Sequence, residues 1–217
     1  PYDEYALESA LRLKESGGGD VVAITCGPLR SAKMLTDAAA VGADSLMHVQ
    51  IDGENSLDST QIQSVLAAAL AKAGCDVVFC GKQAADTNGG STGPGVAMLM
   101  GASCVSHVSE VTADGGGYLA LRASSGGNER VHVSAPCVFA FDKGSEELRR
   151  PNVRGIMMAK KKVIETVSPE DLGISMGESR VSVVSHAPPP EKPPGQKFEG
   201  ADSVATVVSK LRDEANV

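Results

Sequence analysis

The sequence contains no tryptophan, and aromatic residues make up only 3% of its 217 residues. Proteins that bind single-stranded nucleic acids usually stack the bases on aromatic side chains. The chain also lacks an excess of cations, because 27 acidic residues against 20 basic ones give a net charge of −7. Affinity for nucleic-acid phosphates requires clustered positive charge, so we expect no nucleic-acid partner.

No apolar run approaches the ~20 residues that a transmembrane helix requires. The five cysteines form no C-x-x-C pair and the four histidines are far apart, which argues against a zinc site and a disulfide framework. Each cysteine lies in or beside an apolar run, which is typical of small buried side chains in a reducing compartment. These residues are Cys26, Cys75, Cys80, Cys104 and Cys137.

The chain shows no arrangement of residues typical of hydrolases. No Ser/His/Asp or Cys/His combination and no pair of catalytic carboxylates can be argued from the spacing. The histidines lie within or beside expected strands, where core or surface roles are commoner than catalysis; they are His48, His107, His132 and His186.

The first half of the chain alternates helical patterns with short, apolar, β-branched runs. Helices are expected over residues 4–15, 31–41, 59–73 and 95–100, and strands over residues 21–25, 46–49 and 76–80. Gly74 follows the third helix at the usual position of a C-cap. The alternation predicts an α/β fold with a parallel sheet and helices on both faces. Ligands of such sheets bind beyond the carboxyl ends of the strands.

The second half has a different pattern. Strands over 104–111, 117–123 and 129–133, joined by glycine-rich turns, predict an antiparallel excursion, and an apolar strand follows over 136–141. An arginine-rich loop over 143–155 precedes residues 156–162, a short strand over 163–167 and a last candidate strand over 181–185.

We therefore divide the chain into an α/β domain, residues 1–185, and a C-terminal arm, residues 186–217. The arm begins with five prolines within residues 187–194, which favour an extended backbone. It ends in an expected amphipathic helix over 201–215 whose apolar stripe consists of Val204, Val207, Val208 and Leu211. The stripe needs a covering surface, which another subunit could supply.

The most informative segment is the loop over residues 80–94, which follows a strand and leads into a helix. Its small residues would let backbone N–H groups approach an anion, and Ser91 and Thr92 could donate hydroxyl hydrogen bonds. The loop contains neither a Walker motif nor G-x-G-x-x-G. A phosphate or nucleotide site and an ordinary flexible loop both fit this pattern. Asp86 could bind a ribose or purine, or cap a helix.

A second segment, residues 149–162, contains six cations and no acid. It could be a solvated charged surface. It could also be a docking patch for an acidic protein partner, with residues 151–153 as its protruding tip.

Six segments, taken in order and spacing, resemble the beta-subunit family of electron transfer flavoprotein over essentially the whole chain. They are residues 3–15, Cys26-Gly27-Pro28, Val41-Gly42-Ala43-Asp44, residues 81–86 with Thr92-Gly93, residues 156–162 and residues 169–173. The resemblance implies an adenine nucleotide alpha hydrolase-like fold without hydrolysis. It also implies a heterodimer with an alpha subunit that carries the redox-active FAD, while the beta subunit holds a structural AMP.

The resemblance also implies site residues by position. The AMP contacts would be Pro1, Tyr2, Asp3, Cys26, Gly81, Lys82, Gln83, Ala84, Ala85, Asp86, Thr87, Asn88, Gly89, Gly90, Ser91 and Thr92. The partner-recognition loop would comprise Arg150, Pro151, Asn152, Val153, Arg154 and Gly155, with Val153 as its apolar anchor. The lysines that some members trimethylate fall at Met158 and Lys161, so only Lys161 could be modified.

The implied role is that of a non-catalytic subunit of an electron carrier that serves fatty acid beta-oxidation. The complex would accept electrons from acyl-CoA dehydrogenases and other dehydrogenases. It would pass them to the membrane-bound electron transfer flavoprotein-ubiquinone oxidoreductase, with no direct membrane insertion of this chain. The implied location is the mitochondrial matrix in a eukaryote and otherwise the cytoplasm.

Three features depart from the family pattern. The family begins with a further N-terminal segment containing the first strand, so this chain is expected to lack the central strand. An acidic-Asn-Gln run is replaced by residues 87–91, and Pro94 replaces a usual glutamine. Pro94 resembles the electron-bifurcating subgroup, whose beta subunit binds a second FAD. That subgroup, a stand-alone nucleotide-binding protein akin to universal stress proteins, and a scaffold without ligand are the alternatives.

Overall fold

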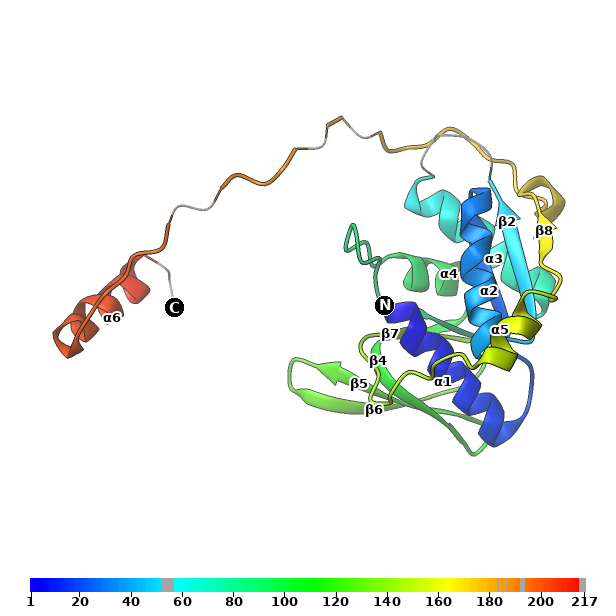
Figure 1. Ribbon diagram of the computed structural model, residues 1–217, viewed down its shortest axis with the longest axis horizontal. Coiled ribbons are helices and arrows are strands. Elements are labelled where there is room, and N and C mark those ends of the chain that lie inside the picture. Colours follow the sequence, from blue (N-terminus) through cyan, green and yellow to red (C-terminus); the bar gives the residue numbers. More distant parts are fainter. Residues whose placement is uncertain (52–56, 183, 186, 192–193, 215–217) are drawn as a thin grey trace. The chain divides into compact units, whose positions relative to one another are not determined.

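The computed structural model describes residues 1–51, 57–182, 184–185, 187–191 and 194–214 (Figure 1). These residues form two compact units, Pro1–Val181 and Ser182–Val217. The first unit contains two separate sheets, each with helices on its faces, and it contains every nucleotide-loop and recognition-loop residue proposed from the sequence.

The first sheet is entirely parallel, with the strand order β1-β2-β8. Its strands are β1 (Val22–Gly27), β2 (Ser45–Gln50) and β8 (Glu165–Val167). Helices α2 (Ala32–Val41) and α5 (Val153–Ala159) contribute to one hydrophobic cluster with β1 and β2. Helix α3 (Ser59–Ala73) contributes to a second cluster, so the sheet is covered on both faces.

The second sheet has the order β3-β7-β4-β5-β6. Its strands are β3 (Val77–Gly81), β4 (Ser103–Asp114), β5 (Gly117–Ser124), β6 (Gly127–Val133) and β7 (Cys137–Phe141). Strands β3 and β4 run parallel to β7, whereas the β4–β5 and β5–β6 pairs are antiparallel, which confirms the predicted antiparallel excursion. Every residue of β7 is buried.

Two helices cover the second sheet. Helix α1 (Tyr2–Gly17) lies over the sheet near β4 and β7 (Figure 1). It packs against β3, β4 and β7, and its Ala6 belongs to the core cluster of this sheet. Helix α4 (Thr92–Met100) packs against β7 and β4. The predicted α/β class with helices on both faces of parallel strands is therefore confirmed.

Local sequence signals explain where two of the helices begin and end. Asp58 and Gln61 form a reciprocal capping box at the start of α3, and Gly74 ends it in the left-handed conformation, as predicted. Helix α4 begins at Thr92, earlier than residue 95, so Pro94 lies in its first turn. Proline costs no helical hydrogen bond there.

The parallel strands fall into two sheets, with β1 and β3 each at an end of its own sheet. Two further elements differ from the sequence predictions. Helix α5 begins at Val153, within the segment that we expected to be a loop. The expected strand over 181–185 is wrong for its described residues: Val181 and Val184 are both exposed, so strand pairing would bury no apolar surface.

The second unit carries one α-helix among its described residues. A short 3-10 turn, Ala201–Ser203, leads into α6 (Val204–Asp213), and residue 215 of the predicted helix lies outside the described part. Phe198 and the valines of α6 line a small cavity of about 190 Å³. Across both units, no described helix is long and apolar enough to cross a membrane.

Candidate nucleotide loop and docking tip

The first turn of α1 lies against the carboxyl end of β3. The Gly81 N–H donates to Asp3 Oδ1 at 2.7 Å, and Lys82 Nζ lies 5.2 Å from the centre of the Tyr2 ring. A Cβ atom at Gly81 would lie 2.8 Å from Tyr2 Cβ, so only glycine permits this approach. The fold thus brings Tyr2 and Asp3 together with Gly81 and Lys82, and Pro1 precedes them as the N-cap of α1.

Lys82 anchors the base of the nucleotide loop, which we define as residues 81–92. Its N–H donates to the Phe141 carbonyl at 2.7 Å, and its Nζ forms an ion pair with Asp142 Oδ2 at 2.7 Å. Burial alone would raise the pKa of Asp142, but hydrogen bonds from Lys82 and from the Lys143 N–H, together with the positive charge of Lys82, outweigh burial and lower that pKa. The Lys82 ammonium is therefore held by protein groups and does not project freely into the loop.

The middle of the nucleotide loop closes on itself. The Ala84 N–H donates to the Gly89 carbonyl at 2.9 Å, and the Asn88 N–H donates to the Ala84 carbonyl at 3.0 Å. Asn88 has a φ of 55°, a conformation that asparagine tolerates better than most residues. Gln83 Nε2 donates to Asn88 Oδ1 at 2.9 Å. The exposed residues of this turn are Ala84, Ala85, Asp86, Thr87, Asn88, Gly89, Gly90 and Ser91.

The end of the nucleotide loop leads directly into α4. Ser91 is the N-cap residue, and its carbonyl and Oγ accept hydrogen bonds from Gln63 Nε2 at 3.0 and 3.2 Å. Asp86 is therefore not a helix cap; its Oδ1 accepts from the Thr87 N–H at 2.8 Å. A Cβ atom at Gly90 would lie 3.1 Å from the Lys82 carbonyl, which leaves little room for a side chain.

Cys26, the remaining residue of the proposed nucleotide site, lies near the carboxyl end of β1 and thus in the other sheet. Burial raises the pKa of its thiol to about 11, so the thiol stays neutral and unreactive at pH 7. All five cysteines are free, but only Cys137 is fully buried as expected; Cys26, Cys75 and Cys80 are partly buried, and Cys104 is exposed.

The partner-recognition segment, here called the docking tip, comprises residues 150–155. Asn152 caps α5 by accepting a hydrogen bond from the Gly155 N–H at 2.7 Å, so Val153 is the first helical residue and is 76% exposed. A Cβ atom at Gly155 would collide with the Ala40 carbonyl of α2, so glycine is required where α5 meets α2. The tip therefore presents an exposed valine on a short, capped helix.

The structure separates the six cations of residues 149–162 into two groups. Arg149 binds acidic residues of α1, and Lys162 Nζ donates to the carbonyls of Ala43 and Asp44. The other four are exposed: Arg150, Arg154, Lys160 and Lys161. The two interpretations offered from the sequence, a solvated surface and a docking patch, thus concern only these four residues, because Arg149 and Lys162 are engaged in contacts within the protein.

Sequence reasoning missed the role of Glu8, which is only 4% exposed and carries a carboxylate. It lies on the buried side of α1 near Leu11, and a buried carboxylate requires partners. Arg12, one turn later, was a detectable partner, but Arg149 was not, because 141 residues separate it from Glu8.

Among the described residues, no three His, Cys, Asp or Glu side chains come together in a group that could hold a metal ion. His48 is buried, and its Nε2 lies 3.0 Å from the Gly27 carbonyl. His107 and His132 lie on β4 and β6, whereas His186 is outside the described residues.

Replacing Gly81 with alanine is expected to destabilise the protein by about 1–3 kcal/mol. The added Cβ would lie 2.8 Å from Tyr2 Cβ and 3.0 Å from the Asp3 backbone nitrogen, so the first turn of α1 would have to move. Thermal unfolding measures the loss. Gly126→Ala, in a turn where an added Cβ would meet no atom within 4 Å, should leave the midpoint unchanged.

Comparisons with known proteins place the chain in a family. The family model of the electron transfer flavoprotein domain matches residues 1–172. The electron transfer flavoprotein subunit beta of Mus musculus is 36% identical over 220 residues, covering 100% of this chain and 85% of the mouse protein. The Bacillus subtilis subunit beta is 32% identical, covering 100% and 86%, and the Homo sapiens subunit beta is 34% identical, covering 98% and 83%. This chain therefore belongs to the electron transfer flavoprotein beta-subunit family.

Proposed function

We propose that the chain binds AMP through its nucleotide loop and pairs with an FAD-carrying alpha subunit to form an electron carrier. The observation that supports this best is the contact between the first turn of α1 and the end of β3. There Asp3 accepts the Gly81 N–H and Tyr2 lies beside Lys82. Two segments far apart in the sequence thus meet beyond the carboxyl end of a parallel strand, the usual ligand position in α/β folds.

The residues present fit a nucleoside monophosphate. Gly90 keeps the inner side of the loop free of a side chain, since a Cβ there would lie 3.1 Å from the Lys82 carbonyl of the same loop, and Gly81 admits the first turn of α1. Ser91 and Thr92 stand at the start of α4, where backbone N–H groups and the helix dipole favour a phosphate. Exposed Asp86 could accept hydrogen bonds from a ribose or purine. AMP would brace the loop and would undergo no reaction.

The redox chemistry of the proposed complex belongs to the FAD of the alpha subunit, and the protein supplies positioning and electrostatics. This chain is proposed to be non-catalytic. Its contribution would be to complete the heterodimer and to receive the donor protein.

The docking tip would bind the donors, which we propose to be acyl-CoA dehydrogenases and other dehydrogenases. Val153 would insert as an apolar anchor, and the surrounding exposed cations would favour an acidic partner surface. The complex would then pass the electrons to the membrane-bound quinone oxidoreductase. We place it in the mitochondrial matrix of a eukaryote or the cytoplasm of a bacterium.

The nucleotide content of the intact heterodimer tests this proposal. We expect the chain, co-expressed with the alpha subunit, to release one FAD and one AMP per heterodimer on denaturation. Chromatography of the released nucleotides against standards gives both ratios.

Other outcomes would replace the proposal with a specific alternative. Two FADs and no AMP would identify a bifurcating type of complex. An isolated chain that is monomeric and hydrolyses ATP would identify a stand-alone nucleotide-binding protein. A heterodimer with one FAD and no other nucleotide would identify a scaffold subunit.

A further inference from the structure

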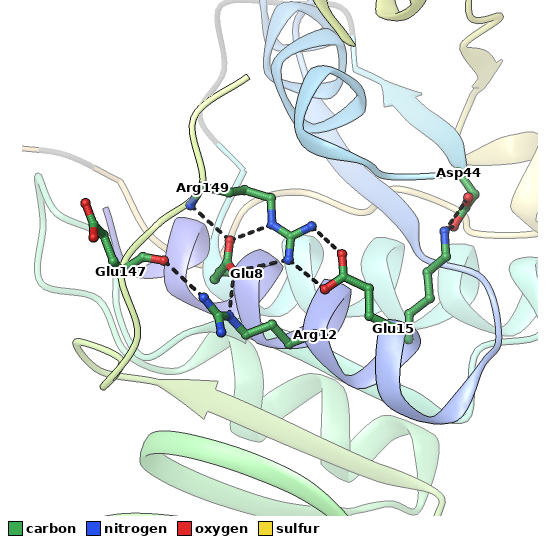
Figure 2. Close-up of polar contacts among 7 residues, drawn as sticks. Glu8, Arg12, Glu15, Asp44, Glu147 and Arg149 are labelled. Carbon is green, nitrogen blue, oxygen red and sulfur yellow. Dashed lines mark hydrogen bonds and ion pairs between the residues drawn. The ribbon is translucent and has the colours of Figure 1, made fainter. Parts of the chain in front are cut away.

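The segment between β7 and α5 is held to α1 by an arginine. This segment, residues 142–152, forms neither helix nor strand. Arg149 donates from its backbone N–H to Glu8 Oε2 at 3.1 Å, from Nε to Oε2 at 2.9 Å and from Nη2 to Oε1 at 3.2 Å. It also donates from Nη1 and Nη2 to the two carboxylate oxygens of Glu15 at 2.6 and 3.1 Å. Figure 2 shows its guanidinium between the two carboxylates.

A second arginine completes the attachment from α1. Arg12 Nε donates to Glu8 Oε1 at 2.6 Å and its Nη2 donates to the Glu147 carbonyl at 3.5 Å (Figure 2). Its Nη1 also lies 3.2 Å from Glu146 Oε2. The strong contacts converge on Glu8, which is almost fully buried. We call Glu8, Glu15 and Arg149 the α1 clamp.

The ionised state of the clamp follows from its hydrogen bonds. Burial alone would raise the pKa of Glu8, but the donors of Arg149 and Arg12 outweigh burial and lower it. Hydrogen bonding from Arg149 lowers the pKa of Glu15. The charged clamp is therefore intact at neutral pH.

The clamp lies immediately before the docking tip, residues 150–155. On the other side of the tip, Gly155 packs against the Ala40 carbonyl and Ala159 is buried in the cluster with α2. The tip is thus a short segment between two fixed points. A short segment fixed at both ends loses little conformational entropy when a partner orders it further.

We propose that Arg149 is a positioning residue: the α1 clamp fixes the docking tip in the geometry that receives an electron-donating protein. This inference rests on the docking function proposed above. The requirement for arginine follows from its shape, since a planar guanidinium can serve two carboxylates at once and a lysine ammonium cannot reproduce that fork. Arg149 itself need not touch the partner.

The test uses the intact heterodimer with its flavin. For Arg149→Gln we expect the KM for a donor dehydrogenase to rise at least tenfold while kcat stays within twofold. The substitution would loosen the docking tip and leave the flavin site unchanged. The donor KM of Arg149→Lys should lie between those of the parent and of Arg149→Gln. Hydrogen exchange of the heterodimer should accelerate in residues 146–156.

Two further variants keep the test decisive. Glu15→Gln removes the exposed half of the clamp and leaves Glu8 paired, so it should fold even if Arg149→Gln does not and should raise the donor KM about threefold. Lys72→Gln is the control, because it removes a surface ion pair with Glu165 at 3.5 Å that lies outside the clamp. It should change neither KM nor exchange in residues 146–156.

The outcomes separate this inference from the docking function. If Val153→Asp raises the donor KM while Arg149→Gln and Glu15→Gln leave both KM and exchange unchanged, the clamp inference is wrong and docking stands. If Val153→Asp has no effect on the donor KM, the docking function is wrong. A lower kcat in Arg149→Gln with unchanged KM would also overturn the inference, because it would indicate an effect on the flavin.

Discussion

Replacing Val153 with aspartate is expected to raise the KM for donor dehydrogenases about thirty-fold and to leave the flavin absorption spectrum unchanged. An apolar anchor at the centre of an interface contributes about 2 kcal/mol or more, which corresponds to that factor. Val153 is 76% exposed and therefore free to enter a pocket on a partner. Its replacement also places a carboxylate against the acidic surface proposed for the partner, where like charges repel.

The substitution should not unfold the helix that carries it. Val153 is the first residue of α5, directly after the Asn152 cap, and acidic residues are favourable in the first turn of a helix. A change in donor KM can then be attributed to docking. Steady-state reduction by a purified dehydrogenase measures the donor KM, and thermal unfolding of the same heterodimer measures its stability.

Val163→Asp is the matched control, since Val163 is 87% exposed and lies after α5, outside the docking tip. It should leave the donor KM within twofold of the parent. Equal effects of the two substitutions would show that general surface charge, and not the tip, governs the reaction with donors.

Features encoded within a few residues were predictable from the sequence. Helix α3 has the predicted bounds because Asp58, Gln61 and Gly74 specify its two ends locally. The start of α5 was missed because Pro151 and the neighbouring arginines indicate a loop. Asn152 nevertheless provides a helix cap there.

Features that depend on pairing between distant segments were not predictable. The residues of β1 and β3 do not themselves specify which strands they pair with, because hydrogen-bonded neighbours are determined by the whole fold. The pairing of Arg149 with Glu8 has the same origin. The nucleotide loop was predictable only in part. Its composition suggested an anion site, but its contact with the first turn of α1 depends on tertiary structure.

Replacing Gly90 with valine is expected to reduce the AMP recovered from the purified heterodimer to below a tenth of the parent value. The backbone of Gly90 is outside the left-handed region, so valine can adopt it, but its Cβ would lie 3.1 Å from the Lys82 carbonyl. Its methyl groups would then occupy space on the inner side of the loop, where backbone N–H groups would otherwise approach a phosphate.

Loss of AMP should also lower the thermal stability of the heterodimer. A ligand present at a hundred times its Kd stabilises the folded protein by about 2.7 kcal/mol, so the effect on the unfolding midpoint is measurable. Gly126→Val is the control, because Gly126 lies in the turn between β5 and β6 with no atom within 4 Å of an added Cβ. It should retain both AMP and stability.

Titration with AMP distinguishes a lost nucleotide from a strained loop. If Gly90→Val destabilises the complex by excluding AMP, added AMP will raise the midpoint of the nucleotide-stripped parent but not that of the variant. If the loop is merely strained, AMP will raise both midpoints by the same amount, because the binding free energy would be unaltered. Full AMP content in the variant would show that the inner side of this loop does not hold the phosphate.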